Sequence, residues 1–149
     1  MTKRILLADD DAGVRQMLKR VLELERYDVV TAGTGAEAAA KFRAHAPDLV
    51  LLDLNMPGKD GWEAFDLMND THPFVPVIVI TAKPRQYERA VAAGVDALME
   101  KPLDLPLLLA TIAGLLAESE AERVRRLTNR DFKTVFLTQT DEACSKRAG

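Results

Sequence analysis

Five short, mainly apolar segments recur along this chain and limit the folds that it can adopt. They occupy residues 5–8, 29–32, 49–52, 77–80 and 97–99. Their hydrophobicity is continuous and does not alternate, which is typical of strands buried on both faces in a parallel sheet that helices cover. With 149 residues, the chain is long enough for one domain with a sizeable core and too short for two ordinary ones.

Stretches with helical spacing separate these strands. Helices are predicted over residues 36–45, 61–69 and 86–93, and two more have apolar faces made of Val14, Leu18, Val21 and Leu22 and of Leu108, Ile112, Leu115 and Leu116. The alternation of strand and helix predicts an α/β fold: a doubly wound, five-stranded parallel sheet with helices on both faces. We expect this domain to span residues 1–118.

The character of the sequence changes after residue 118. Residues 118–126 are charged and helix-prone and are expected to prolong the last helix, and an irregular tail follows from Thr128. We therefore interpret residues 119–149 as a C-terminal extension and not as a separate domain. Deletion of the tail is expected to cost little stability. A large drop in melting temperature on deletion would show that four apolar residues of the tail pack on the domain or across a dimer, and these are Phe132, Val135, Phe136 and Leu137.

The composition is that of a folded, water-soluble protein, with 48% hydrophobic and 29% charged residues. A net charge of −3 favours neither nucleic acid nor an anionic membrane. The sequence has no signal-peptide pattern and no apolar stretch long enough to span a bilayer. A single cysteine, Cys144, excludes an internal disulfide. We therefore expect a cytoplasmic protein that does not contact membranes.

A basic cluster precedes the tail, and it consists of Arg123, Arg125, Arg126 and Arg130. Residues 127–130 are similar to the opening of a helix-turn-helix, but too little sequence follows to complete one. We expect no nucleic-acid binding within this chain, and a longer gene product would reopen the question.

Polar side chains gather where the predicted strands end. Asp9 and Asp10 follow the first strand, Asp53 closes the third, and Thr81 and Lys101 close the fourth and fifth. The carboxyl ends of parallel strands meet at one edge, and the flavodoxin-like order 2-1-3-4-5 places the first and third strands side by side. Three carboxylates would then face one crevice, flanked by a hydroxyl and an ammonium group.

Three unpaired carboxylates would raise one another's pKa, and a divalent cation removes this repulsion. Oxygen ligands without a nearby histidine or cysteine favour Mg2+. One carboxylate could then attack phosphorus and form an aspartyl phosphate. Taken alone, the acidic run at residues 9–11 is equally consistent with a solvated turn in which Asp11 caps the next helix. We assign this capping role to Asp11 itself.

Four segments together resemble the motifs of bacterial two-component response-regulator receivers, of which the chemotaxis receivers are an example. They are LADDD at residues 7–11, LLDLNMPG at 51–58 with Asp60 and Gly61, VITA at 79–82 and EKP at 100–102. The segments fall in the family's order and spacing, and the resemblance covers roughly residues 3 to 117.

The resemblance implies a phosphorelay signalling protein, which at most catalyses its own phosphotransfer and autodephosphorylation. It implies Asp53 as the phosphoacceptor, with Mg2+ held by Asp9, Asp10, Asp53 and the backbone carbonyl of Asn55. The phosphodonor would be a sensor histidine kinase or a phosphotransfer protein, and the output would act through a protein partner that the sequence does not identify. Whether the protein is a homodimer is left open.

The resemblance also implies that Thr81, Ala82 and Lys101 bind the phosphoryl group, that Thr81 reports phosphorylation, and that the Lys101–Pro102 bond is cis. One position departs from the family. An aromatic residue usually lies three residues before the lysine, and this chain has Leu98 there. The usual coupling between that aromatic ring and the threonine is therefore in doubt.

Two residues are interpreted as modulators of the phosphoryl lifetime, Asn55 and Lys83. Lys83 lies two residues past Thr81, where Pro84 restrains it toward an extended conformation. An ammonium group there could approach the phosphoryl group and slow its hydrolysis.

Two other functions are considered. A receiver-like scaffold that is never phosphorylated is consistent with Leu98. A haloacid-dehalogenase-like phosphatase also uses carboxylates, magnesium and lysine, but its motif has a second aspartate two residues after the nucleophile. Here that position is Asn55, and Asp53 lies on the third strand where that family uses the first.

Overall fold

The chain folds into alternating strands and helices, as the apolar segments predict. The computed structural model describes residues 2–56, 61–83, 85–129, 132 and 134–137. The elements are β1 (Arg4–Ala8), α1 (Ala12–Leu24), β2 (Asp28–Ala32), α2 (Gly35–His45), β3 (Leu49–Asp53), α3 (Gly61–Thr71), β4 (Val77–Thr81), α4 (Tyr87–Ala93), β5 (Ala97–Glu100), α5 (Leu105–Ala117), α6 (Glu120–Thr128) and β6 (Val135–Leu137). Pro57, Gly58, Asp60, Pro84, Arg130 and Cys144 lie outside the described residues.

The strands form one parallel sheet in the order β2-β1-β3-β4-β5-β6. For the first five strands this is the predicted order, so the predicted fold class is confirmed. The sixth strand was not predicted. It lies beside β5 and comes from the segment that we expected to be an irregular tail.

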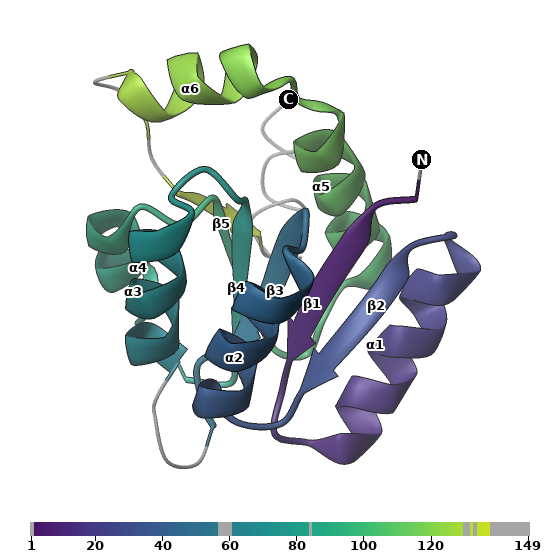
Figure 1. Ribbon diagram of the computed structural model, residues 1–149. Helices are drawn as coiled ribbons and strands as arrows, with labels where there is room; N and C mark the ends of the chain where they lie inside the picture. Colours follow the sequence, from purple (N-terminus) through teal and green to yellow (C-terminus); the bar gives the residue numbers. More distant parts are fainter. Residues whose placement is uncertain (1, 57–60, 84, 130–131, 133, 138–149) are drawn as a thin grey trace, which may run out of the picture.

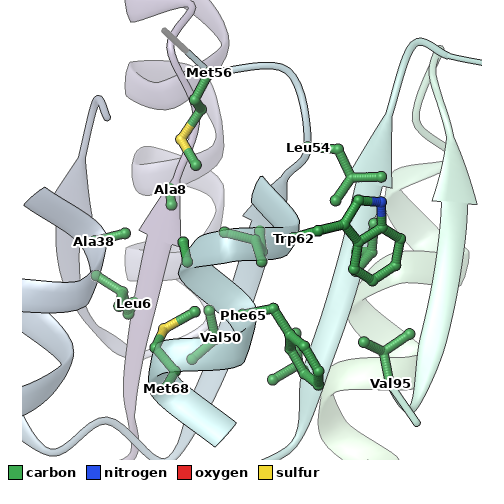
Figure 2. Packing of buried hydrophobic residues seen from close by; sticks show 14 of the residues in the cluster. Leu6, Ala8, Ala38, Val50, Leu54, Met56, Trp62, Phe65, Met68 and Val95 are labelled. Carbon is green, nitrogen blue, oxygen red and sulfur yellow. The ribbon is translucent and has the colours of Figure 1, made fainter. Parts of the chain in front are cut away.

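Helices cover both faces of the sheet (Figure 1). Successive residues of a strand point to opposite faces, so each strand contributes to two cores. On one face, Val50 belongs to a cluster with Phe65 of α3 and with side chains of α2 and α4. Figure 2 shows Val50 and Phe65 in this cluster together with Ala38 of α2. On the other face, Leu51 shares a cluster with Leu18 of α1 and Ile112 of α5. Among the described helices, none is both long and apolar enough to cross a membrane.

The extension does not prolong the last helix, which corrects our expectation. Helix α5 ends at Ala117, and α6 begins at Glu120 after two extended residues, Glu118 and Ser119. The hydroxyl of Ser119 accepts a hydrogen bond from the amide of Glu122, whose carboxylate accepts one from the amide of Ser119. This capping box stabilises a new helix start. The Ser-x-x-Glu spacing was therefore the sequence signal for the break.

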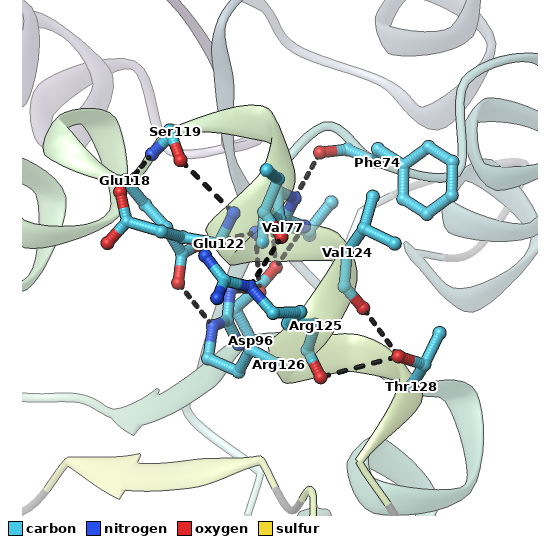
Figure 3. Close-up of polar contacts among 12 residues, drawn as sticks. Phe74, Val77, Asp96, Glu118, Ser119, Glu122, Val124, Arg125, Arg126 and Thr128 are labelled. Carbon is cyan, nitrogen blue, oxygen red and sulfur yellow. Dashed lines mark hydrogen bonds and ion pairs between the residues drawn. The ribbon is translucent and has the colours of Figure 1, made fainter.

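Helix α6 is attached to the sheet through Asp96, a buried residue just before β5. Arg123 donates to both carboxylate oxygens of Asp96, at 2.9 and 3.1 Å, and Arg126 donates to Asp96 at 2.8 Å. Arg126 also binds Glu118 through two hydrogen bonds of 2.7 and 2.9 Å. Figure 3 draws this network. Two arginines of the basic cluster are thus paired with carboxylates of the same chain.

The described part of the tail packs on the domain. The hydroxyl of Thr134, which is buried, donates to a backbone carbonyl before β5 at 2.6 Å. Tyr87 of α4 donates to the carbonyl of Thr134 at 2.8 Å, and its ring stacks on Phe136 with centroids 5.4 Å apart. Leu137 is buried as well. The described residues of the tail thus contact the domain, and the effect of their deletion on stability stays a prediction. The contact was missed because a three-residue strand is too short to show hydrophobic periodicity.

We predict that Arg123→Ala destabilises the protein by roughly 2–3 kcal/mol. The substitution removes one partner from a buried ion pair, although Arg126 still compensates the charge of Asp96. Urea unfolding measures the effect. Arg125→Ala is the matched control, because Arg125 is exposed on the same helix. Equal stability of the two variants would show that the ion pair between Arg123 and Asp96 does not hold α6 on the sheet.

Candidate functional site

The strand order brings two predicted acidic residues to one edge of the sheet. Strands β1 and β3 are neighbours, with Ala8 opposite Leu52, so Asp9 and Asp53 follow at adjacent strand ends. Both side chains are almost fully buried, with exposed fractions of 0% and 1%. The amide of Asn55 donates to Asp53 Oδ1 at 3.0 Å, which fixes one oxygen of that carboxylate.

Lys101 binds both carboxylates from the end of β5. Its Nζ lies 3.3 Å from Asp9 Oδ2 and 3.3 Å from Asp53 Oδ2. Burial alone would lower the pKa of Lys101, but the two carboxylates raise this pKa above its usual range. Strand β4 separates β5 from β3, so only a long side chain can reach across to the acidic pair. Lysine at this position meets that requirement.

The carboxyl group of Asp53 has a pKa close to neutral pH. Its pKa is raised from an ordinary 3.8 to about 6, because the effects of burial and of the Asp9 charge together outweigh the lowering by the Asn55 amide and Lys101. Two carboxylates share one ammonium group, so the pair keeps an excess of negative charge. This excess favours binding of a cation.

The acidic residues fit a divalent metal ion. One oxygen each from Asp9, Asp10 and Asp53 lies within 4.8 Å of the other two. All three ligands are carboxylates, the type that Mg2+ prefers. Asp10 is exposed, so it borders the solvent from which water ligands would come. The predicted ligand side chains are therefore brought together.

Thr81 ends β4 beside this cluster and is fully buried. Its hydroxyl accepts a hydrogen bond from the amide of Lys83 at 2.9 Å, and its carbonyl accepts one from the amide of Lys101 at 2.8 Å. Thr81 thus joins the loop after β4 to the end of β5. Ala82 and Lys83 are exposed, and among the described residues the Lys83 ammonium has no ion-pair partner.

Two expectations concern the residues around Lys101. The Lys101–Pro102 bond is cis, as predicted. Leu98 is fully buried in the cluster on the α2, α3 and α4 face. The departure from the family pattern therefore places an aliphatic side chain inside the core.

Two residues have roles near the site that the sequence analysis missed. A Cβ on Gly61 would lie 2.5 Å from Leu54 Cα and 2.9 Å from the Asp53 carbonyl oxygen, so glycine lets α3 begin against the end of β3. Arg15 of α1 donates to the Asp9 carbonyl at 2.6 Å. Gly61 belongs to one of the segments that resemble the receiver family, so its importance could have been found from the sequence. Arg15 had no comparable signal, because spacing along a helix does not show which loop a side chain reaches.

Comparison with known proteins identifies the family of this chain. The family described as Response regulator receiver domain matches residues 5–113. The chain therefore belongs to the response regulator receiver family of two-component signalling proteins. Response regulator MprA of Mycobacterium tuberculosis is 36% identical over 161 residues, covering 96% of this chain and 70% of that protein. Transcriptional regulatory protein TrcR of the same species is 35% identical, covering 93% of this chain and 61% of that protein.

Solved receiver structures share the fold. A CheY-like receiver domain protein from Methanospirillum hungatei superposes with a TM-score of 0.75 at 31% identity, covering 78% of this chain and 95% of that chain. The response regulator TrrA from Thermotoga maritima, solved in complex with Mg(2+)-BeF, has a TM-score of 0.70 at 32% identity, covering 76% and 99%.

We predict that Asp53→Asn is more stable than the wild-type protein at neutral pH without Mg2+. Because the folded-state pKa of Asp53 lies above 3.8, at about 6, the folded wild type binds more protons than the unfolded chain between these values. Its stability therefore falls as pH rises through this window, and asparagine removes that loss.

Urea unfolding in EDTA at several pH values tests this prediction. The two proteins should differ little below about pH 4, and the difference should become constant above about pH 7. Asp66→Asn, an exposed substitution on α3, controls for the general loss of a carboxylate. Parallel pH profiles for wild type and Asp53→Asn would contradict the raised pKa.

Proposed function

We propose that this protein is a phosphorelay receiver that accepts a phosphoryl group on Asp53 in a Mg2+-dependent reaction. The observation that carries the proposal is the contact of one ammonium, Lys101 Nζ, with the buried carboxylates of Asp9 and Asp53. Receiver family membership supports it. The phosphodonor is a sensor histidine kinase or a phosphotransfer protein, and the output acts through a protein partner.

The chemistry assigns one role to each residue. A carboxylate oxygen of Asp53 attacks phosphorus, and the bond from phosphorus to the donor's imidazole nitrogen breaks as the new bond forms. At pH 7 the carboxyl group is mostly ionised, because its pKa is about 6. Lys101 and the Thr81 hydroxyl would bind phosphoryl oxygens together with the amide of Ala82.

Mg2+ would be held by Asp9, Asp10, Asp53 and the backbone carbonyl of Asn55. When bound, the ion neutralises charge on the carboxylates and on the phosphoryl oxygens. The proximity of the three carboxylates supports this assignment. The Mg(2+)-BeF complex of the related TrrA is consistent with it.

The cytoplasm is the proposed location, because a histidine kinase and a reducing environment for Cys144 are both found there. The protein is proposed to signal and to catalyse at most its own phosphotransfer and autodephosphorylation. A scaffold that is never phosphorylated is the second candidate, and buried Leu98, which replaces the family's aromatic residue, favours it.

Incubation with acetyl phosphate and Mg2+ followed by intact-mass measurement tests the proposed function. Wild type should gain one phosphoryl group, and Asp53→Asn should gain none, because an amide lacks the nucleophilic carboxylate. Asp66→Asn should behave like wild type. The same mass gain in Asp53→Asn with wild-type kinetics would show that the acceptor lies elsewhere, and no gain in wild type would favour the scaffold.

We predict a shorter phosphoaspartate half-life for Lys83→Ala than for wild type. The hydrogen bond between the Lys83 amide and Thr81 keeps this residue next to the proposed phosphoryl site. An ammonium there stabilises the phosphorylated ground state and slows hydrolysis, with roughly ten-fold in rate for each 1.4 kcal/mol. The half-life is measured by intact mass at fixed Mg2+, with Lys19→Ala as the exposed control. A half-life equal to or longer than that of wild type would refute the role.

A further inference from the structure

The direction of the Asp10 carboxylate is set by the conformation of the backbone around Asp10. Asp9 and Asp53 are held by Lys101, and each also accepts a backbone hydrogen bond. In the described part of the chain, the Asp10 side chain has no hydrogen-bond or ion-pair partner, and it is exposed. Its approach to the other two carboxylates therefore reflects the conformation of the loop between β1 and α1.

Arg15 fixes this loop from the first turns of α1. Its Nη1 donates to the carbonyl oxygen of Asp9 at 2.6 Å, and that carbonyl belongs to the peptide that joins Asp9 to Asp10. The amide of Arg15 in turn donates to the carbonyl of Asp11 at 2.9 Å, which begins the helix. The side chain thus reaches back over the acidic loop and holds the peptide that orients Asp10.

The guanidinium group also lies close to a second loop. A Cβ placed on Gly33, in the loop between β2 and α2, would lie 3.2 Å from Arg15 Nη1. Gly33 has no positive φ, so alanine would not strain the backbone there. Glycine at this position therefore provides space for the arginine.

We propose that Arg15 is a positioning residue for the Mg2+ site, acting through the peptide between Asp9 and Asp10. The inference deepens the proposed function and rests on it. Groups that orient metal ligands typically change metal affinity by about 10–100-fold when they are mutated. A purely electrostatic role predicts the opposite sign, because removal of a positive charge near the site strengthens cation binding.

Titration calorimetry of the full chain with MgCl2 distinguishes these roles. Arg15→Ala should bind Mg2+ about ten-fold more weakly than wild type. Arg20→Ala, which removes the same charge from an exposed position of α1, should bind like wild type. Unchanged or tighter binding by Arg15→Ala would overturn the proposal.

Gly33→Ala provides a second variant that keeps Arg15 and crowds its guanidinium group, and it should also weaken Mg2+ binding. This variant carries the test if thermal unfolding shows that Arg15→Ala does not fold. Wild-type affinity in a folded Gly33→Ala, with no result from Arg15→Ala, would count against the proposal.

A double-mutant cycle tests the route through Asp10. In an Asp10→Ala background, Arg15→Ala should cause no further loss of Mg2+ affinity, since the ligand that it orients is absent. Independent, additive losses would show that Arg15 acts by another route. Failure of the metal site itself is recognised separately, because Asp9→Ala and Asp10→Ala would then leave Mg2+ affinity unchanged.

Discussion

Two buried carboxylates that share one ammonium group set the main constraint on this structure. Asp9 and Asp53 can lie together only because β1 and β3 are adjacent, and Lys101 can reach them only across the end of β4. The residue at the end of β4, where Lys101 crosses, is Thr81, which is small and buried. The contacts among these three charged groups therefore depend on the strand order and on the helix crossovers that produce it. They also depend on the lengths of the three side chains.

Much of this arrangement could be predicted from the sequence because its signals are local. Continuous apolar runs indicated five of the six strands in the described part of the chain, and the residues that end these five strands indicated the site. The sixth strand was missed because three residues have no measurable period. The pairing of Asp96 with Arg123 and Arg126 was missed because the partners are 27 and 30 residues apart. The contact of Arg15 with Asp9 also depends on side-chain direction, which spacing does not reveal.

The extension changes the surroundings of Leu98, where the family usually has an aromatic side chain. Phe136 of β6 lies opposite Leu98 in the strand register and stacks on Tyr87 of α4. Aromatic side chains are therefore present on neighbouring elements although β5 has none at this position. The usual inward swing of a β5 aromatic cannot operate in this chain.

The pairing of β6 with β5 also determines which strand is available at this side of the sheet. An exposed edge strand can pair through its backbone with a strand of another molecule, and proteins often limit this with short or covered edges. Among the described residues, the backbone of β5 is covered by β6, a strand of three residues. Strand-to-strand association of two copies through β5 would therefore require β6 to detach first.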